Sequence, residues 1–268
     1  MTRSLKCLAF DTSTDVMSIG VSHGGQTWLH TGAGGAQAST TLIPAIFKLL
    51  ADAGLALGEL DAIAFGRGPG SFTGLRTACA VAQGLAFGAN HGAGLPVLPI
   101  DSLMAVAEEA RFQHALANPE GAGGPWCVTA LLDARMDELY SQTFTLSVAA
   151  NCYAINSILC NKNGDPTAIR PEIWHFEPVL TLNGACARHL LAGNVFEVYA
   201  DRLPATPGIA RRHALPTAAA LLRLAPGLVA AGQCVPAAQA LPLYVRDKVA
   251  LTTDERSAVK AAKLLAQP

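Results

Sequence analysis

Charged and aromatic residues are both scarce in this chain. Of its 268 residues, 15% are charged and 6% are aromatic, whereas 51% are hydrophobic. A chain of this length and apolar content can form two packed cores, which excludes disorder as a general description. The formal net charge is -1, and no stretch has the cluster of Lys and Arg residues that would follow a nucleic-acid backbone. We therefore do not expect the chain to bind nucleic acid by itself.

Long apolar runs and paired metal-ligand residues are also missing. No apolar run approaches the roughly 20 residues of a membrane span, and the first run, 7–10, is too short for a signal peptide. The seven cysteines include no C-x-x-C pair, and the seven histidines include no pair four residues apart. Because such spacings are typical of zinc sites, we expect no metal site. The sequence thus predicts a cytoplasmic protein with reduced cysteines.

The first part of the chain alternates strands and helices, in an order that a Rossmann unit does not have. Turn glycines Gly24 and Gly25 lie between two alternating stretches, which predicts a β-hairpin. This order predicts a mixed sheet with a parallel part covered by helices. The predicted strands are 7–10, 16–21, 26–31, 62–65 and 97–100, and the predicted helices are 39–53, 73–87 and 102–117.

A second unit begins after the Pro- and Gly-rich segment 118–125, which predicts a linker. Strands predicted over 126–132 and 139–147 flank a turn that starts at Asp133, as Asp11 starts the turn after the first strand. This weak repeat indicates a duplicated domain whose two turns face each other across a cleft. Two interpretations stay open. The turns form a phosphate site, or the aspartates only accept hydrogen bonds from their own turn amides.

The remaining segments carry weaker signals. The polar stretch 151–167 predicts a surface insertion of unreadable function, and the extended segment 241–245 contains Pro242, as edge strands do. The tail 247–268 includes a helix with a capping box over 252–265, which either packs or binds a partner. Further strands are predicted over 179–182 and 195–199, and helices over 185–191 and 217–231. The sequence does not show on which half the last helix packs.

Residues 66–76, Gly-Arg-Gly-Pro-Gly-Ser-Phe-Thr-Gly-Leu-Arg, carry the most information. Three glycines in five positions allow close backbone approach, and the following helix directs free amide groups at the loop, so an anion would bind well there. The loop has neither the Walker lysine nor the last glycine of the dinucleotide fingerprint. The candidate nucleotide- or phosphate-binding residues are Asp11, Thr12, Ser13, Gly68, Gly70 and Ser71.

Small residues recur every four positions in the predicted helix 73–87, at Gly74, Ala78, Ala82 and Ala86. Such a ridge lets another helix approach to within about 8 Å of its axis. The packing partner is either a helix of the same chain or a helix of another subunit, and spacing alone does not distinguish them.

Four separated stretches, 8–14, 66–76, 133–140 and 242–246, resemble the TsaB (YeaZ) family. Together they span nearly the whole chain in the expected order, and the second stretch is highly specific. The resemblance implies a two-subdomain actin-like ATPase fold with a ribonuclease H-like core, an α/β fold of mixed sheets covered by helices. It also implies an N-terminal dimerisation subdomain, 1–102, and a C-terminal subdomain with the terminal segment, 103–268.

In function, the resemblance implies a non-catalytic subunit that binds and activates the paralogue TsaD. TsaD transfers a threonylcarbamoyl group to the adenosine next to the anticodon of tRNAs reading codons that start with A, and the ATPase TsaE joins the complex. TsaD holds the metal through two histidines four residues apart on a helix, whereas the corresponding helix here, 39–53, has none. This chain would therefore have no catalytic residue, metal or cofactor of its own. tRNA and ATP or ADP would enter through the complex, and the isolated chain would be a monomer or a homodimer.

The resemblance places two helices of the first subdomain at the subunit interface. We accordingly predict that Leu75→Glu leaves a folded monomer that no longer binds TsaD. Many family members carry a histidine just before the first of these helices, where this chain has the segment 36–38, Ala-Gln-Ala. The predicted interface residues are Ile43, Ile46, Phe47, Phe72, Leu75, Arg76, Cys79 and Ala82.

Two other functions fit parts of the sequence. A small-molecule kinase or ATPase of the same superfamily would use Asp11 and the Asp133 turn, with Asp101 as a catalytic carboxylate, although helix capping explains Asp101 equally well. A peptidase would use Ser71, but Ser71 lies outside a Gly-x-Ser-x-Gly elbow and has no histidine nearby in sequence. ATP turnover by the isolated chain would favour the kinase.

Overall fold

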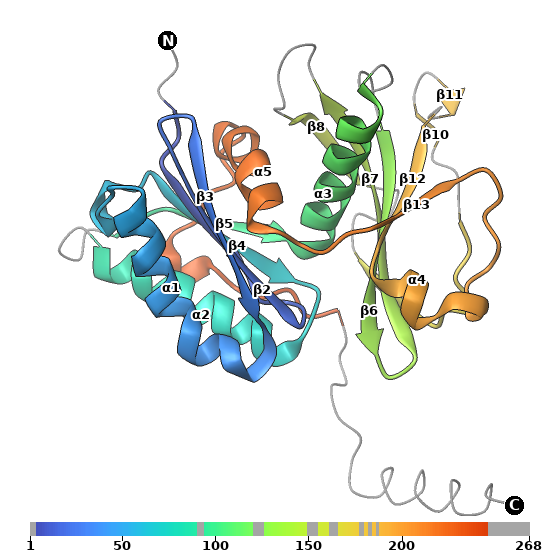
Figure 1. Cartoon of the computed structure of the whole chain (residues 1–268), viewed down its shortest axis with the longest axis horizontal. Coiled ribbons are helices and arrows are strands. Elements are labelled where there is room, and N and C mark those ends of the chain that lie inside the picture. The colour runs from blue at the N-terminus through green and yellow to red at the C-terminus, as the bar shows by residue number, and fades with distance from the viewer. Residues whose placement is uncertain are drawn as a thin grey trace, which may run out of the picture.

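The computed structural model describes residues 4–89, 94–119, 126–148, 155–160, 166–176, 180–181, 184–185 and 188–245 (Figure 1). The predicted tail helix 252–265 lies outside these residues, as do most of the linker 118–125 and parts of the stretch 151–167. Within the described ranges, no helix combines the length and the apolar character needed to cross a bilayer.

The first sheet is mixed and is covered by helices on both faces. It contains β1 (Cys7–Asp11), β2 (Val16–His23), β3 (Gln26–Ala33), β4 (Ala62–Gly68) and β5 (Val97–Asp101) in the order β3-β2-β1-β4-β5. The first three strands pair antiparallel, whereas β4 pairs parallel with both β1 and β5. Helices α1 (Ala38–Asp52) and α2 (Phe72–Gly88) cover one face, and α5 (Ala218–Ala230) covers the other (Figure 1). Because both faces are covered, β1 is buried along its whole length.

The second sheet has the strand order β13-β12-β6-β7-β8, and β9 also pairs with β7. Helix α3 (Ser102–Ala117) packs on one face, and the other face carries a smaller core that includes Trp174 and Tyr199. The strands are β6 (Trp126–Arg135), β7 (Glu138–Val148), β8 (Ile155–Cys160), β9 (Thr167–Ile169), β12 (His189–Gly193) and β13 (Ala210–His213). The predicted α/β fold of two mixed sheets covered by helices is confirmed.

Shorter elements complete the described chain. The strands β10 (Leu180–Thr181) and β11 (Gly184–Ala185) pair only with each other in the ladder that the structure describes. The short helix α4 (Val195–Val198) follows β12. The 3-10 turns are Gly35–Gln37, Leu57–Glu59, Ala200–Arg202 and Ala237–Gln239.

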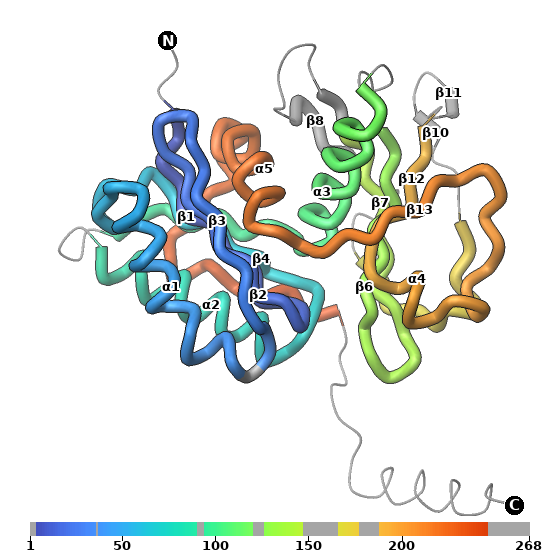
Figure 2. The backbone as a smooth tube through the Cα atoms, in the orientation of Figure 1, coloured from blue at the N-terminus to red at the C-terminus, as the bar shows by residue number. Residues whose placement is uncertain are grey.

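Helix α5 packs on the first sheet, which answers the question that the sequence left open. It contacts β1 and β2 and also lies beside α3 between the two sheets (Figures 1 and 2). Beyond it, Val235 bridges the outer edge of β5. The described residues 218–245 therefore return to the first sheet, although the predicted C-terminal subdomain, 103–268, includes them. The division at residue 102 stays a prediction.

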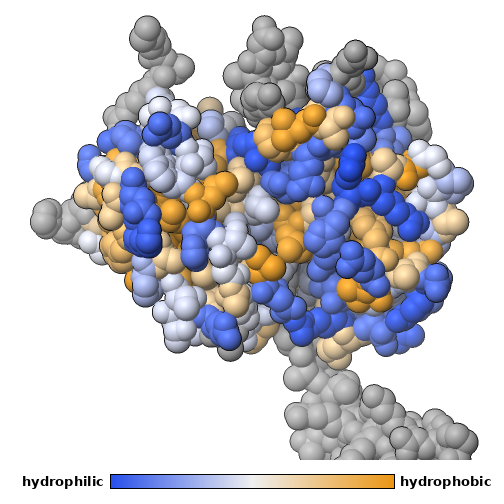
Figure 3. Space-filling view, in the orientation of Figure 1, coloured by the Kyte–Doolittle hydropathy of each residue, from blue (hydrophilic) through white to orange (hydrophobic). Residues whose placement is uncertain are grey.

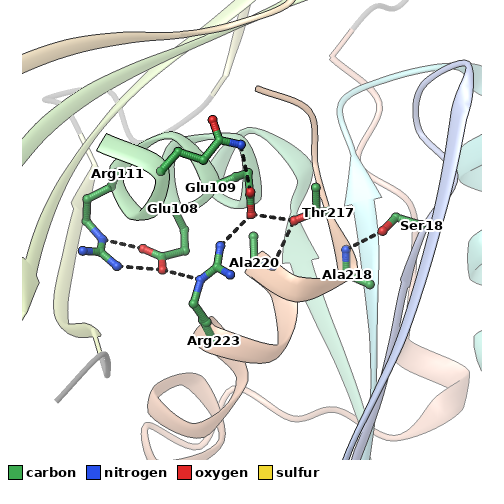
Figure 4. A network of polar contacts seen from close by, with 9 residues as sticks. Ser18, Glu108, Glu109, Arg111, Thr217, Ala218, Ala220 and Arg223 are labelled. Atoms are coloured by element: carbon green, nitrogen blue, oxygen red, sulfur yellow. Dashed lines mark hydrogen bonds and ion pairs between the residues drawn. The ribbon is translucent and has the colours of Figure 1, made fainter. Parts of the chain in front are cut away.

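A network of buried ion pairs joins α3 to α5 (Figure 4). Arg111 donates two hydrogen bonds to the carboxylate of Glu108, at 2.7 and 2.9 Å, and both side chains are buried. Arg223 of α5 donates to Glu108 at 2.8 Å and to Glu109 at 2.6 Å. Thr217 caps α5 by accepting from the Ala220 amide and donates its hydroxyl to Glu109. Ion pairs thus connect α3, which packs on the second sheet, with α5, which packs on the first.

Two predicted elements of the second half are wrong. Residues 185–191 were expected to form a helix and 195–199 a strand, but the structure has strand β12 at His189–Gly193 and helix α4 at Val195–Val198. β12 pairs in parallel with both β6 and β13. Periodicity alone does not distinguish helix from strand in so short an apolar run, and hydrogen bonds to these two strands make it a strand. In α4, Val195 is buried in the smaller core, and this burial overrides the strand preference of its β-branched side chain.

The stretch 151–167 also differs from the prediction. Its described residues 155–160 form β8, which pairs antiparallel with β7. Residues 167–169 form β9, which pairs with the other end of β7. The stretch is therefore part of the second sheet and not only a surface insertion.

Candidate functional site

The carboxylate of Asp11 lies at the end of β1 and is completely buried. Its Oδ1 accepts hydrogen bonds from the Ser13 amide and the Ser13 hydroxyl, each at 2.7 Å, and its Oδ2 accepts one from the Ser102 hydroxyl at 2.7 Å. Burial raises the pKa of Asp11 above its ordinary value of 3.8, although the hydrogen bonds from Ser13 and Ser102 oppose the shift. Both carboxylate oxygens accept hydrogen bonds from the protein itself, so Asp11 stabilises its own turn.

The glycines of the loop 66–76 let that loop pack directly against the Asp11 turn. A Cβ atom at Gly66 would lie 1.7 Å from Oδ2 of Asp11, and one at Gly74 would lie 1.8 Å from the carbonyl oxygen of Thr12. The Ser71 amide donates to the carbonyl of Ser13 at 2.7 Å, and the Thr12 hydroxyl donates to the carbonyl of Gly74 at 2.7 Å. Close packing between the two chain segments is therefore enough to explain why these positions are glycine. Phosphate binding is not needed for that explanation.

Gly74→Ala is expected to lower the free energy of unfolding by about 3 kcal/mol, because the new methyl group overlaps backbone atoms that cannot move freely. Gly84→Ala on the same helix is the matched control, since nothing lies within 4 Å of a Cβ atom there. The control should gain up to about 1 kcal/mol from the higher helix propensity of alanine. Urea denaturation of both variants measures the difference, and equal stabilities would contradict the packing that we describe.

The pH dependence of the stability of Asp11→Asn, compared with wild type, tests whether the Asp11 carboxylate is buried. The folded-state pKa of Asp11 is raised, so its contribution to stability is fully present below the unfolded pKa and is lost as pH rises through the folded value. Asparagine does not titrate. The free energy of unfolding of the variant, relative to wild type, should therefore increase as pH rises above about 4. Denaturation series at several pH values measure this slope, and a slope of opposite sign would refute the assignment.

The turn after β6 repeats the contacts of the Asp11 turn. Oδ1 of Asp133 accepts from the Arg135 amide at 2.8 Å, the same two-residue spacing as between Asp11 and Ser13. It also accepts from the hydroxyl of Tyr199 at 2.6 Å. Burial and the hydrogen bond to Asp133 raise the pKa of Tyr199. The sequence left open whether these aspartates bind phosphate or accept hydrogen bonds from their own turn amides. The structure shows the turn-amide hydrogen bond at both Asp11 and Asp133.

The two turns face each other across a cleft between the sheets. Ser13, Gly70 and Ser71 line it on one side, and Asp133 and Arg135 line it on the other. Of the predicted phosphate-binding residues, Ser13, Gly70 and Ser71 line the cleft. Asp11, Thr12 and Gly68 do not. The cleft has a volume of about 250 Å³, below the roughly 300–1,000 Å³ of typical small-molecule sites. Nucleotide binding here stays a prediction.

One ion pair crosses the mouth of this cleft. Nη2 of Arg135 lies 2.7 Å from Oδ1 of Asp15, and both side chains are largely exposed. Arg135, Met136 and Asp137 all have left-handed backbone angles, with φ of 58, 56 and 59°. Three consecutive non-glycine residues in this region store strain. In the described part of the chain, no three His, Cys, Asp or Glu side chains gather as a metal site would require.

Half of the predicted interface residues point into the core. Leu75 is 1% exposed, and Ile46, Cys79 and Ala82 are also buried. Each of the four is at most 7% exposed in the single chain, so we correct the prediction for them. Ile46 of α1 and Cys79 and Ala82 of α2 belong to the core between these helices and the first sheet. Leu75 packs beside Gly68 at the base of the cleft. We now expect the predicted test Leu75→Glu to destabilise the fold, because it places a carboxylate at a position that is only 1% exposed.

The other four predicted residues remain accessible. Ile43 and Phe47, one turn apart on α1, are 43% and 47% exposed. Phe72 and Arg76 lie at the start of α2, where the guanidinium carbon of Arg76 is 3.8 Å from the centre of the Phe72 ring. These residues stay predictions for the interface.

The segment 240–245 lies along α2, a contact that the sequence did not reveal. The carbonyl of Ala240 accepts from Cys79 at 2.9 Å and from Gln83 at 3.0 Å. Tyr244 packs its ring 5.2 Å from that of Phe72 and accepts from Arg76 at 3.2 Å. The only sequence signal for this contact was the position of Tyr244 within the stretch 242–246.

Comparisons with known proteins agree with this architecture. The family model described as "TsaD: tRNA N6-adenosine threonylcarbamoyltransferase" matches residues 29–156. A Haemophilus influenzae protein, "tRNA threonylcarbamoyladenosine biosynthesis protein TsaB", is 41% identical over 138 residues, which span 52% of this chain and 53% of that protein. The Escherichia coli protein of the same name is 30% identical over 251 residues, 92% of this chain and 96% of the relative.

Among solved structures, YeaZ from Pseudomonas aeruginosa is similar, with a TM-score of 0.70 and 34% sequence identity. The match covers 90% of this chain and 99% of that protein. It confirms the two-subdomain actin-like fold that the sequence predicted. Sequence similarity over nearly the whole length and similarity of fold lead to one assignment: the chain belongs to the TsaB (YeaZ) family.

Proposed function

We propose that this chain takes part in tRNA threonylcarbamoyladenosine biosynthesis as a non-catalytic subunit that binds and activates TsaD. The names of its relatives support the pathway. The family model named for TsaD covers residues 29–156, which include α1 and α2. TsaD therefore carries a related segment, and two related helix pairs can pack against each other with approximate twofold symmetry.

The observation that carries the proposal is the outer face of α1 and α2, which we define by Ile43, Phe47, Ala80, Gly84 and Phe87. Its three large apolar side chains are each more than 40% exposed: Ile43 43%, Phe47 47% and Phe87 56%. Ala80 and Gly84 are exposed and one turn apart, so a second helix can approach α2 closely. Figure 3 shows hydrophobic residues exposed among polar ones over this part of the molecule.

The hydrogen bonds that Asp11 and Asp133 accept within the chain support a non-catalytic role. A kinase or ATPase needs a carboxylate that is free to act on a nucleophile or a metal. Asp11 is buried and accepts three hydrogen bonds through both carboxylate oxygens, and Oδ1 of Asp133 accepts from Arg135 and Tyr199. In our proposal, ATP or ADP, TsaE and tRNA therefore act through the complex and not on this chain alone.

Reconstitution of the modification reaction tests the proposal. TsaD, TsaE, ATP, threonylcarbamoyl-adenylate and unmodified tRNA are incubated with and without this chain, and the modified adenosine is quantified. We expect product only when the chain is present, and none from the chain without TsaD. Equal product without the chain, or product from the chain alone, would overturn the proposal.

A further inference from the structure

Two ring nitrogens near the end of α3 are buried without hydrogen-bond partners. They are Nε1 of Trp126 and Nδ1 of His114, and neither has a partner in the part of the chain that the structure describes. Trp126 is only 5% exposed, and its indole N–H can act only as a donor. A buried donor without an acceptor costs about 1–3 kcal/mol. This N–H group therefore needs an acceptor that the described residues do not supply.

The two rings come together because the last turn of α3 lies against the first residue of β6. Helix α3 packs over β6 and β12 (Figure 1), and the rings of His114 and Trp126 meet edge to face with their centres 4.8 Å apart. The backbone carbonyl of His114 accepts from the amide and from Nδ2 of Asn118, each at 3.0 Å. This carbonyl is thus paired within the chain, whereas the two ring nitrogens are not.

Two arginines flank these rings. Arg188 precedes β12, and its guanidinium carbon lies 5.6 Å from the centre of the Trp126 ring. Arg212 lies on β13 beside Ala192, whose side chain belongs to the core under α3. Burial lowers the pKa of His114, and the nearby charge of Arg212 lowers it further. Both arginines are only half-buried, so an ion from solution can reach them.

We propose that Trp126, His114, Arg188 and Arg212 bind a phosphate group. None of the four residues is acidic, and the two arginines contribute two positive charges. Guanidinium groups donate charge-assisted hydrogen bonds to phosphate oxygens, and a phosphate oxygen supplies the acceptor for the indole N–H. Nδ1 of His114 donates in the tautomer that carries the proton there. Water would bind the indole N–H whether or not the arginines are present, whereas a phosphate requires their charge.

The phosphate has two sources. It is either the free ion or a phosphate of the tRNA backbone, which the site would bind once the complex with TsaD has assembled. Arginines beside aromatic rings suit both sources. The site lies on the second sheet, whereas the outer face of α1 and α2 belongs to the first. Binding of the free ion therefore does not depend on the proposed function, and only the tRNA source rests on it.

The indole N–H signals of the isolated chain test the proposal. They are followed by proton–nitrogen correlation NMR during a titration with inorganic phosphate at constant ionic strength. The chain has three tryptophans, and Trp126→Phe identifies the signal of Trp126. We expect this signal to shift and to saturate, because the phosphate accepts from its N–H. The signal of Trp174 is the internal control, since its Nε1 already donates to Ser141 at 3.1 Å.

Arg212→Gln should increase the Kd for inorganic phosphate at least about tenfold, because one charge-assisted hydrogen bond is lost. Arg211→Gln is the matched control, since it removes the same charge from the same strand. Arg211 lies beside Leu191, which belongs to the smaller core on the opposite face of the sheet, and its guanidinium carbon is 5.5 Å from the centre of the Phe196 ring. This control should bind phosphate like wild type.

Binding of tRNA by the complex with TsaD distinguishes the two sources. Weaker tRNA binding with Arg212→Gln than with Arg211→Gln assigns the site to a tRNA phosphate, and equal tRNA binding with the two variants assigns it to the free ion. The proposal is overturned if the Trp126 signal does not shift or does not saturate with inorganic phosphate. It is also overturned if the two variants bind inorganic phosphate equally well.

Discussion

Glu108→Ala should lower the free energy of unfolding by about 3–5 kcal/mol, since it leaves a buried guanidinium without its partner. Arg111 is 1% exposed, and among the described contacts its ion pair is with Glu108 alone. Arg223 loses one of its two carboxylate partners in the same variant. Figure 4 shows that Glu108 stands between these two arginines, so its removal also weakens the link between α3 and α5.

A second substitution tests whether the unpaired charge of Arg111 causes the loss of stability. Glu108→Ala combined with Arg111→Met removes both buried charges and should recover a large part of the lost stability, because apolar groups often replace a buried pair without loss. Glu172→Ala is the control for an ion pair at the surface, and its pair with Arg202 is exposed on both sides. That variant should change little. Urea denaturation measures all three variants. A Glu108→Ala protein as stable as the Glu172→Ala protein would contradict the role of the network.

Phe47→Glu is expected to weaken binding to TsaD at least about 100-fold while the chain stays folded. The side chain is 47% exposed, so a carboxylate at this position remains hydrated in the free chain. In a helix-to-helix contact it would be desolvated without a partner, and truncation of a central aromatic residue alone often costs 2 kcal/mol or more. Isothermal titration of the variant with TsaD measures the loss.

Val198→Glu is the matched control for this substitution. Val198 is 54% exposed and lies on α4, next to the second sheet and away from α1 and α2. It should bind TsaD like wild type. Equal weakening of both variants would show that charge alone, and not the outer face of α1 and α2, reduces binding.

The sequence predicted the first sheet closely, because local signals determine it. The turn glycines Gly24 and Gly25 separate β2 from β3 as expected, and both have positive φ. The stretch 66–76 joins a strand to a helix as predicted, although β4 extends to Gly68 and α2 begins at Phe72, so the connecting loop itself is only 69–71. The errors at β12 and α4 have the opposite origin, since pairing with β6 and β13 and burial under the second sheet determine these short segments.

The candidate site was harder to predict, because its residues come from distant parts of the chain. Spacing identified Asp11 and the glycines, but it did not show that Ser102, 91 residues away in sequence, closes the second carboxylate oxygen. Nor did it show which side of α2 faces outward. Only the packing of α2 on the sheet shows that Gly74 and Ala78 are buried while Ala80 and Gly84 are exposed.

Light scattering on a size-exclusion column, with the purified chain and TsaD from the same organism, tests the central claim most directly. Our account predicts a stable complex in which each TsaD binds one copy of this chain, and it predicts that Phe47→Glu elutes separately from TsaD whereas Val198→Glu elutes with it. Separate elution of wild type and TsaD at micromolar concentration, with TsaE and ATP present, would contradict the account.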